Sequence, residues 1–107
     1  MTRKDILETA VEITTTDRNE WYGEPEDNFK LIAEFWQSYI KTCVDPGADI
    51  SISAGDVANM MILFKVARAA TALDQKADTF IDIAGYAACG GEIATLEKMV
   101  QLIDITR

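Results

Sequence analysis

The sequence predicts an all-α protein, a helical bundle of about four helices forming a single domain over residues 1–107. Apolar residues recur at spacings of three and four in long stretches, which is the period of an α-helix. Residues typical of helix starts precede two of these stretches. A composition of 49% hydrophobic and 26% charged residues is that of a folded globular domain.

The first two helices are expected over residues 3–15 and from about 25 to 43. Thr2 is placed to cap the first helix, with Asp5 three residues later as in a capping box. Pro25 suits the first turn of the second helix. The polar segment before it, residues 17–28, predicts an ordered loop.

The last two helices are expected from about 54 to 72 and from about 78 to 102. Ser53 and Asp56 predict a capped start after a short extended segment, residues 49–53. The third helix is apolar on nearly all sides, which predicts a central helix, a subunit interface or both. In the fourth helix, Gly90 and Gly91 indicate either a close helix crossing or a break.

Composition narrows the function classes and the compartment. The net charge of −8 disfavours DNA or RNA as a partner, because phosphate backbones are repelled. The chain has no histidine, which excludes imidazole catalysis. Cys43 and Cys89 form no CxxC motif and are expected to be small buried residues in a reducing cytosol. Neither a signal peptide nor a membrane span is visible, so we expect a cytoplasmic protein with no membrane partner.

Asp78 and Asp82 stand four residues apart, on one face of the last helix and one turn from each other. Two carboxylates at this spacing can hold Mg²⁺ together with the phosphates of a ligand. Alternatively, Asp78 caps the helix and Asp82 pairs with Arg68. Both interpretations fit the spacing.

Lys65 and Arg68 lie three apart on the very apolar third helix. They can form a phosphate clamp, in which Arg gives two parallel hydrogen bonds and Lys a point charge. They can equally form internal ion pairs with the two aspartates, and the two arrangements can coexist.

Aromatic residues are the candidates for binding a base. Trp21 and Tyr22 beside Gly23 can stack on a base or sugar, or Trp21 can cover the edge of the core. Tyr86 follows Asp82 on the same helical face, where it can hydrogen-bond a ligand or Asp82 itself.

These residues together resemble a family of small phage and prophage proteins. The pattern is a YG-x-P loop (Tyr22–Pro25), a K-x-x-R helix (Lys65–Arg68) and a D-x-x-x-D-x-A-x-Y helix (Asp78–Tyr86). The pattern is similar to nucleotide-modification-associated helical domains of phage genomes. More distantly it resembles the MazG-like all-α nucleoside-triphosphate pyrophosphohydrolases.

The resemblance implies a MazG-like fold in the cytoplasm of a bacterial host and a nucleotide as the small-molecule partner. It also implies a Mg²⁺-dependent pyrophosphohydrolase, with Asp78 and Asp82 as metal ligands. The family's other acidic motif has no counterpart on the third helix, and Asp27 and Glu34 are the other acids within reach. The alternatives are a non-catalytic protein that binds or sequesters nucleotides or nucleotide-derived signals, and a structural helical oligomer. The apolar third helix leads us to expect a homo-oligomer in each case.

Overall fold

The computed structural model describes residues 1–16 and 23–106, and every regular element in these ranges is helical. The helices are α1 (Arg3–Thr15), α3 (Pro25–Tyr39), α4 (Ala54–Thr71) and α5 (Ala77–Thr106). A single π-helical turn, η1 (Ile40–Val44), extends α3. The all-α prediction with about four helices is therefore confirmed for the described part of the chain.

Local signals set where the helices begin. The Thr2 hydroxyl accepts the Asp5 N–H while the Asp5 carboxylate accepts the Thr2 N–H, so the predicted capping box starts α1. Ser53 and Asp56 form the same reciprocal pair at the start of α4. Pro25 occupies the first turn of α3, where its missing N–H costs nothing.

The second predicted helix ends in a π-helical turn, and the fourth continues without a break through its two adjacent glycines. The Asp45 N–H donates to the Ile40 carbonyl across five residues, which makes the last turn π-helical. No break occurs at Gly90 and Gly91, because α5 runs through both as one helix of 30 residues. The alternative of a close crossing is the one the structure supports, since a Cβ on Gly90 would lie 3.0 Å from the Ala58 Cβ.

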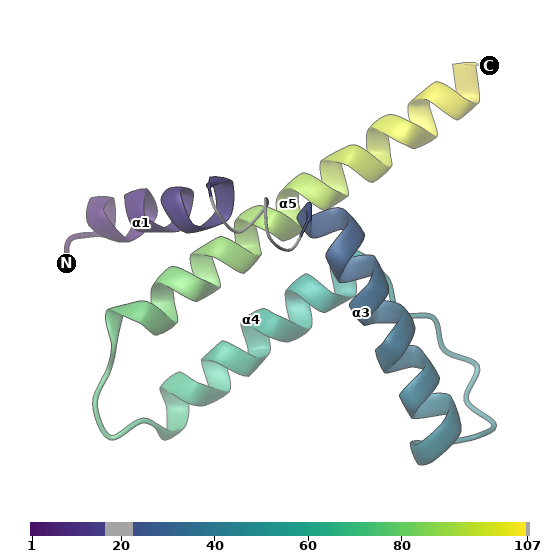
Figure 1. Cartoon of the computed structure of the whole chain (residues 1–107), viewed down its shortest axis with the longest axis horizontal. Coiled ribbons are helices and arrows are strands. Elements are labelled where there is room, and N and C mark those ends of the chain that lie inside the picture. The colour runs from purple at the N-terminus through teal and green to yellow at the C-terminus, as the bar shows by residue number, and fades with distance from the viewer. Residues whose placement is uncertain (17–22, 107) are drawn as a thin grey trace.

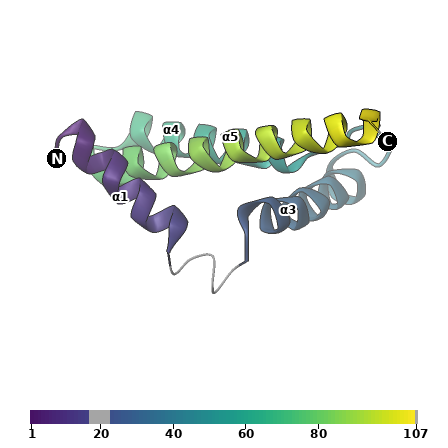
Figure 2. The same ribbon diagram turned by 90° about the horizontal axis from the view of Figure 1, so that it is seen from above.

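The four helices form two layers. Helices α4 and α5 pack side by side and run in opposite directions, and α1 and α3 lie on the same side of this pair (Figures 1 and 2). The C-terminal end of α5 extends beyond the other helices (Figure 1). No helix in the described ranges is long and apolar enough to cross a membrane.

The core is small and lies where α3, α4 and α5 meet. Its buried residues are Phe29, Ala33, Ala54, Val57, Ala58 and Ile93. Trp36 and Cys89 pack against it partly buried, whereas Cys43 is exposed on the π-helical turn. The expectation of a buried Cys43 was wrong, because that turn lies outside the helix-packing region. Helix α4 buries only one side, and several of its large apolar residues are exposed.

Candidate functional site

A cavity of about 240 Å³ lies between α1, the start of α3, and the facing parts of α4 and α5. Its wall is mainly apolar, formed by Ile13, Phe29, Ile32, Met61, Ile81 and Cys89 among others. Its polar side chains are Thr14, Asn28, Asp82 and Tyr86. An apolar hollow with a few polar groups is the usual form of a small-molecule site.

Two glycines shape the wall of this cavity. At Gly85, a Cβ would lie 3.3 Å from Thr14 Cγ2, so the absence of a side chain lets α1 approach α5 closely. Gly23 has a φ of 80°, in the left-handed region that glycine adopts without steric cost. The glycine of the YG-x-P pattern thus has a conformational reason to be there, and it positions the start of α3 at the cavity.

Asp82 and Lys65 meet in an ion pair at this cavity. Lys65 Nζ lies 2.8 Å from Asp82 Oδ2, and the two side chains are 16% and 33% exposed. Asp82, predicted from the sequence as a metal ligand, lines the cavity from α5. The Lys65 ammonium lies beside an Asp82 oxygen that was predicted to bind Mg²⁺. Asp82 therefore forms an internal ion pair, which was the alternative to a metal site.

Of the four predicted charged residues, Asp82 lines the cavity, whereas Lys65, Arg68 and Asp78 lie outside its lining. Asp78 is exposed in the first turn of α5. Arg68 is also exposed, and its guanidinium lies 4.8 Å from the centre of the Phe64 ring in a cation–π contact. The structure therefore brings together one pair of the four charges and does not place all of them at one cavity.

Of the three predicted base-binding aromatics, Tyr86 is at the cavity. It is half-buried, and its ring centre lies 6.1 Å from that of Phe29, with the ring planes tilted by 39°. Both rings line the cavity. Trp21 and Tyr22 lie outside the described residues, although Thr14 and Gly23 on either side of their segment belong to the cavity wall.

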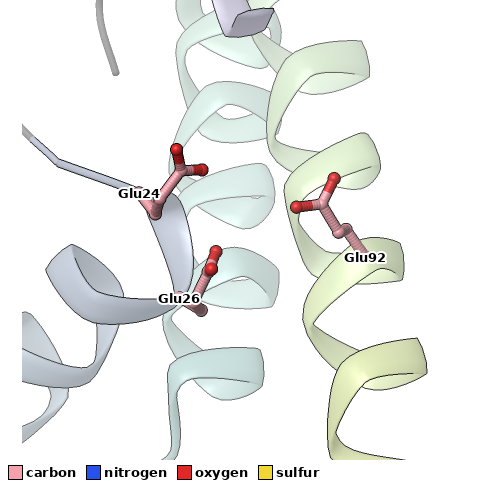
Figure 3. Close-up of side chains that lie close together, drawn as sticks. All are labelled: Glu24, Glu26 and Glu92. Atoms are coloured by element: carbon pink, nitrogen blue, oxygen red, sulfur yellow. The ribbon is translucent and has the colours of Figure 1, made fainter. Parts of the chain in front are cut away.

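Three glutamates form a carboxylate group next to the cavity. Glu24 precedes α3, Glu26 lies in its first turn, and Glu92 comes from α5; one carboxylate oxygen of each lies within 4.8 Å of the others. Figure 3 shows Glu24 and Glu26 on one side and Glu92 facing them from the opposite helix. Pro25, between the first two, lines the cavity, and so does Cys89, one turn before Glu92.

The electrostatics of this carboxylate group favour a cation. Three like charges at this separation repel one another, and the positive N-terminal end of α3 offsets only part of that repulsion. Glu26 Oε2 is shielded from solvent and has no hydrogen-bond partner among the described residues. Carboxylate oxygens in such a group are the ligands that Mg²⁺ and Ca²⁺ prefer.

Sequence reasoning missed this group because it depends on helix packing. Glu26 and Glu92 are far apart in the chain and lie on different helices. One signal was available: Asp82, Tyr86, Cys89 and Glu92 follow one another at helical spacing and mark one face of α5. Asp27 and Glu34, the acids considered instead, are exposed on α3 and do not belong to the group.

Comparisons with known proteins place the chain among phage proteins. A family described as "Domain of unknown function (DUF6378)" matches residues 5–94. A protein named Gene 55 protein from Mycobacterium phage D29 is 41% identical over 86 residues, which are 80% of this chain and 51% of that protein. Its namesake from Mycobacterium phage L5 is 38% identical over 94 residues, 88% of this chain and 51% of that protein. The chain thus spans about half the length of these curated relatives, and no solved structure matches it.

Proposed function

This chain belongs to the DUF6378 family, which has relatives in mycobacteriophages, and we propose that it binds a nucleotide or nucleotide-like small molecule together with Mg²⁺. The observation that carries the proposal is an apolar cavity with a group of three carboxylates next to its lining: Pro25, between Glu24 and Glu26, and Cys89, one turn before Glu92, belong to the cavity wall. A nucleotide has two matching parts, a flat base and a chain of phosphates that binds a divalent cation.

The base is assigned to the cavity. Its volume of about 240 Å³ and its apolar wall suit a flat ring, and the Tyr86 and Phe29 rings offer surfaces for stacking. Asn28 and Thr14 supply the hydrogen-bonding groups that would orient such a ring.

The phosphates are assigned to the edge of the cavity where Glu24, Glu26 and Glu92 meet. A Mg²⁺ ion bound there would neutralise phosphate charge and lower the pKa of a bound water. The chain's own contribution is to hold three carboxylates at the right separation from two different helices. The earlier assignment of Mg²⁺ to Asp78 and Asp82 stays a competing prediction, which requires Lys65 to release Asp82.

Lys65 and Arg68 also stay predicted phosphate ligands. Lys65 would exchange the carboxylate of the cavity-lining Asp82 for a phosphate oxygen, a short movement for a long flexible side chain. Arg68 would have to leave the Phe64 ring and reach past the cavity wall, so we assign it a smaller effect.

Nucleotide pyrophosphohydrolysis is the second candidate function, favoured by the same carboxylate group. Acidic residues that hold Mg²⁺ beside a phosphate chain can orient a water for attack on phosphorus. Binding without turnover needs only the cavity, the cation and the fold, so binding is the function proposed first.

Calorimetric titration tests the proposal. The protein is titrated with each nucleoside triphosphate and with cyclic dinucleotides, with and without Mg²⁺, and pyrophosphate release is followed in parallel. Saturable, Mg²⁺-dependent binding is expected. Glu92→Gln should weaken it tenfold or more, whereas Glu97→Gln, on the same helix outside the group, should leave it unchanged.

Three further outcomes separate the alternatives. Pyrophosphate release that is abolished by Glu92→Gln identifies an enzyme. Binding that is lost in Asp82→Asn but not in Glu92→Gln moves the cation to the aspartate pair. No heat with any ligand refutes the nucleotide proposal and leaves the structural oligomer.

A further inference from the structure

The outward face of α4 is apolar, with the Lys65 and Arg68 cations lying over the Phe64 ring at its margin. The buried residues of α4 lie on the side toward α3 and α5, and at 100° per residue the opposite side carries Met60, Leu63, Ala67 and Ala70, with Phe64 at its margin. All five are exposed, and Leu63 is 65% exposed. The spacing of three and four is that of the a and d positions through which helices pair. We call these five residues the α4 face.

The whole chain exposes more surface than a monomer of its mass should. A folded monomer of 11.8 kDa is expected to expose about 5,900 Å², whereas this chain exposes 8027 Å². Its radius of gyration is 16.1 Å, against about 13 Å for a compact domain of this length. The excess of roughly 2,100 Å² per chain lies within the range of about 1,000–2,500 Å² that an obligate homodimer buries on each partner.

We propose that the α4 face is the centre of a homodimer interface, in which it pairs with the same face of a second copy. Two features of the face favour a second copy as the occupant. An apolar, nearly uncharged strip suits an obligate interface, and a twofold axis across one helix makes a strip of this kind complementary to itself. The small side chains of Ala67 and Ala70 let two backbones approach closely, while Met60, Leu63 and Phe64 supply the apolar area.

A second exposed apolar strip lies on the C-terminal half of α5, where Leu96, Met99 and Val100 share one face at 100° per residue. Glu92 lies on the same face, and it belongs to the carboxylate group at the start of α3. On the α4 face the first charged neighbour toward the N-terminus is Asp56, which is engaged in the capping box. The five residues of the α4 face are uncharged, so pairing of this face removes apolar surface from water and desolvates little charge.

Size-exclusion chromatography with light scattering on the full chain, without ligand, tests the proposal. The expected mass is about twice the 11.8 kDa of one chain. Leu63→Glu should reduce the mass to that of one chain, because it places a charge at the centre of the interface. Leu7→Glu is the matched control, because Leu7 is 60% exposed on α1. This variant should keep the same mass as the wild type.

Circular dichroism of both variants shows whether a variant with a changed mass is still folded. A helical Leu63→Glu monomer supports the proposal, and Met60→Glu repeats the test if Leu63→Glu loses its helical signal. A wild-type mass of one chain at micromolar concentration overturns it. So does a Leu63→Glu variant that keeps the dimer mass. Because no nucleotide is present, none of these outcomes depends on the proposed function.

Discussion

Replacing Gly90 by alanine should destabilise the protein or leave its stability unchanged, whereas the same replacement at the adjacent Gly91 should stabilise it. Both glycines lie inside α5, where alanine is favoured over glycine by about 1 kcal/mol. At Gly91 a new Cβ would meet no atom within 4 Å, so the full gain is expected.

At Gly90 the new Cβ would lie 3.0 Å from the Ala58 Cβ, against an optimum of about 3.5–4.0 Å between carbon atoms. Ala58 is fully buried in the core and has no rotamer through which to yield. Relief requires α4 and α5 to separate, and overpacking of this kind costs about 1–3 kcal/mol. The loss therefore offsets or exceeds the gain in helix propensity, and the two variants should differ by about 1–3 kcal/mol in the free energy of unfolding.

Urea denaturation followed by far-UV circular dichroism measures this difference, with all proteins at one concentration because a dimer makes stability concentration-dependent. Ala58→Gly in the Gly90→Ala background should remove the steric part of the loss. Equal stabilisation by both alanines would refute the inferred close crossing of α4 and α5 at Gly90.

Three other perturbations follow from single contacts. Asp82→Asn should cost about 1–2 kcal/mol in urea denaturation, because it leaves the mostly buried Lys65 ammonium uncompensated; the cost is less than for a fully buried pair, since Asp82 is 33% exposed, and an unchanged midpoint contradicts this. Ser53→Ala should cost about 1 kcal/mol by removing the cap of α4, and Ser53→Gly only a few tenths; equal losses argue against a capping role. Hydrogen bonds from the Thr2 N–H and then the Thr2 side chain hold the pKa of Asp5 below the ordinary 3.8, so an NMR titration of Asp5 should have its midpoint below that value. Since the folded-state pKa is the lower one, the stabilisation is present above the unfolded pKa and disappears as the pH falls through the folded pKa; a midpoint at or above 3.8 refutes the bond.

Much of the candidate site depends on how the helices pack against one another, which local sequence patterns do not predict. The sequence predicted Asp82 and Tyr86, and the structure places both at the cavity. It also grouped Asp78 and Arg68 with them, because spacing on a helix says which residues share a face but not where the neighbouring helices end. Glu92 was overlooked for the converse reason: its partners Glu24 and Glu26 lie at the start of α3, 68 and 66 positions away in the chain.

The sequence by itself determined the helices and their starts. The capping boxes at Thr2 and Ser53 depend on contacts within four residues, and apolar periodicity depends only on the geometry of one helix, so both can be predicted without tertiary information. The tertiary structure alone decided that Gly90 marks a crossing and not a break, that Lys65 pairs with Asp82, and that three glutamates converge. Each of these depends on how one helix is placed against another, which is fixed by the fit of side chains across the whole core and not by any local pattern.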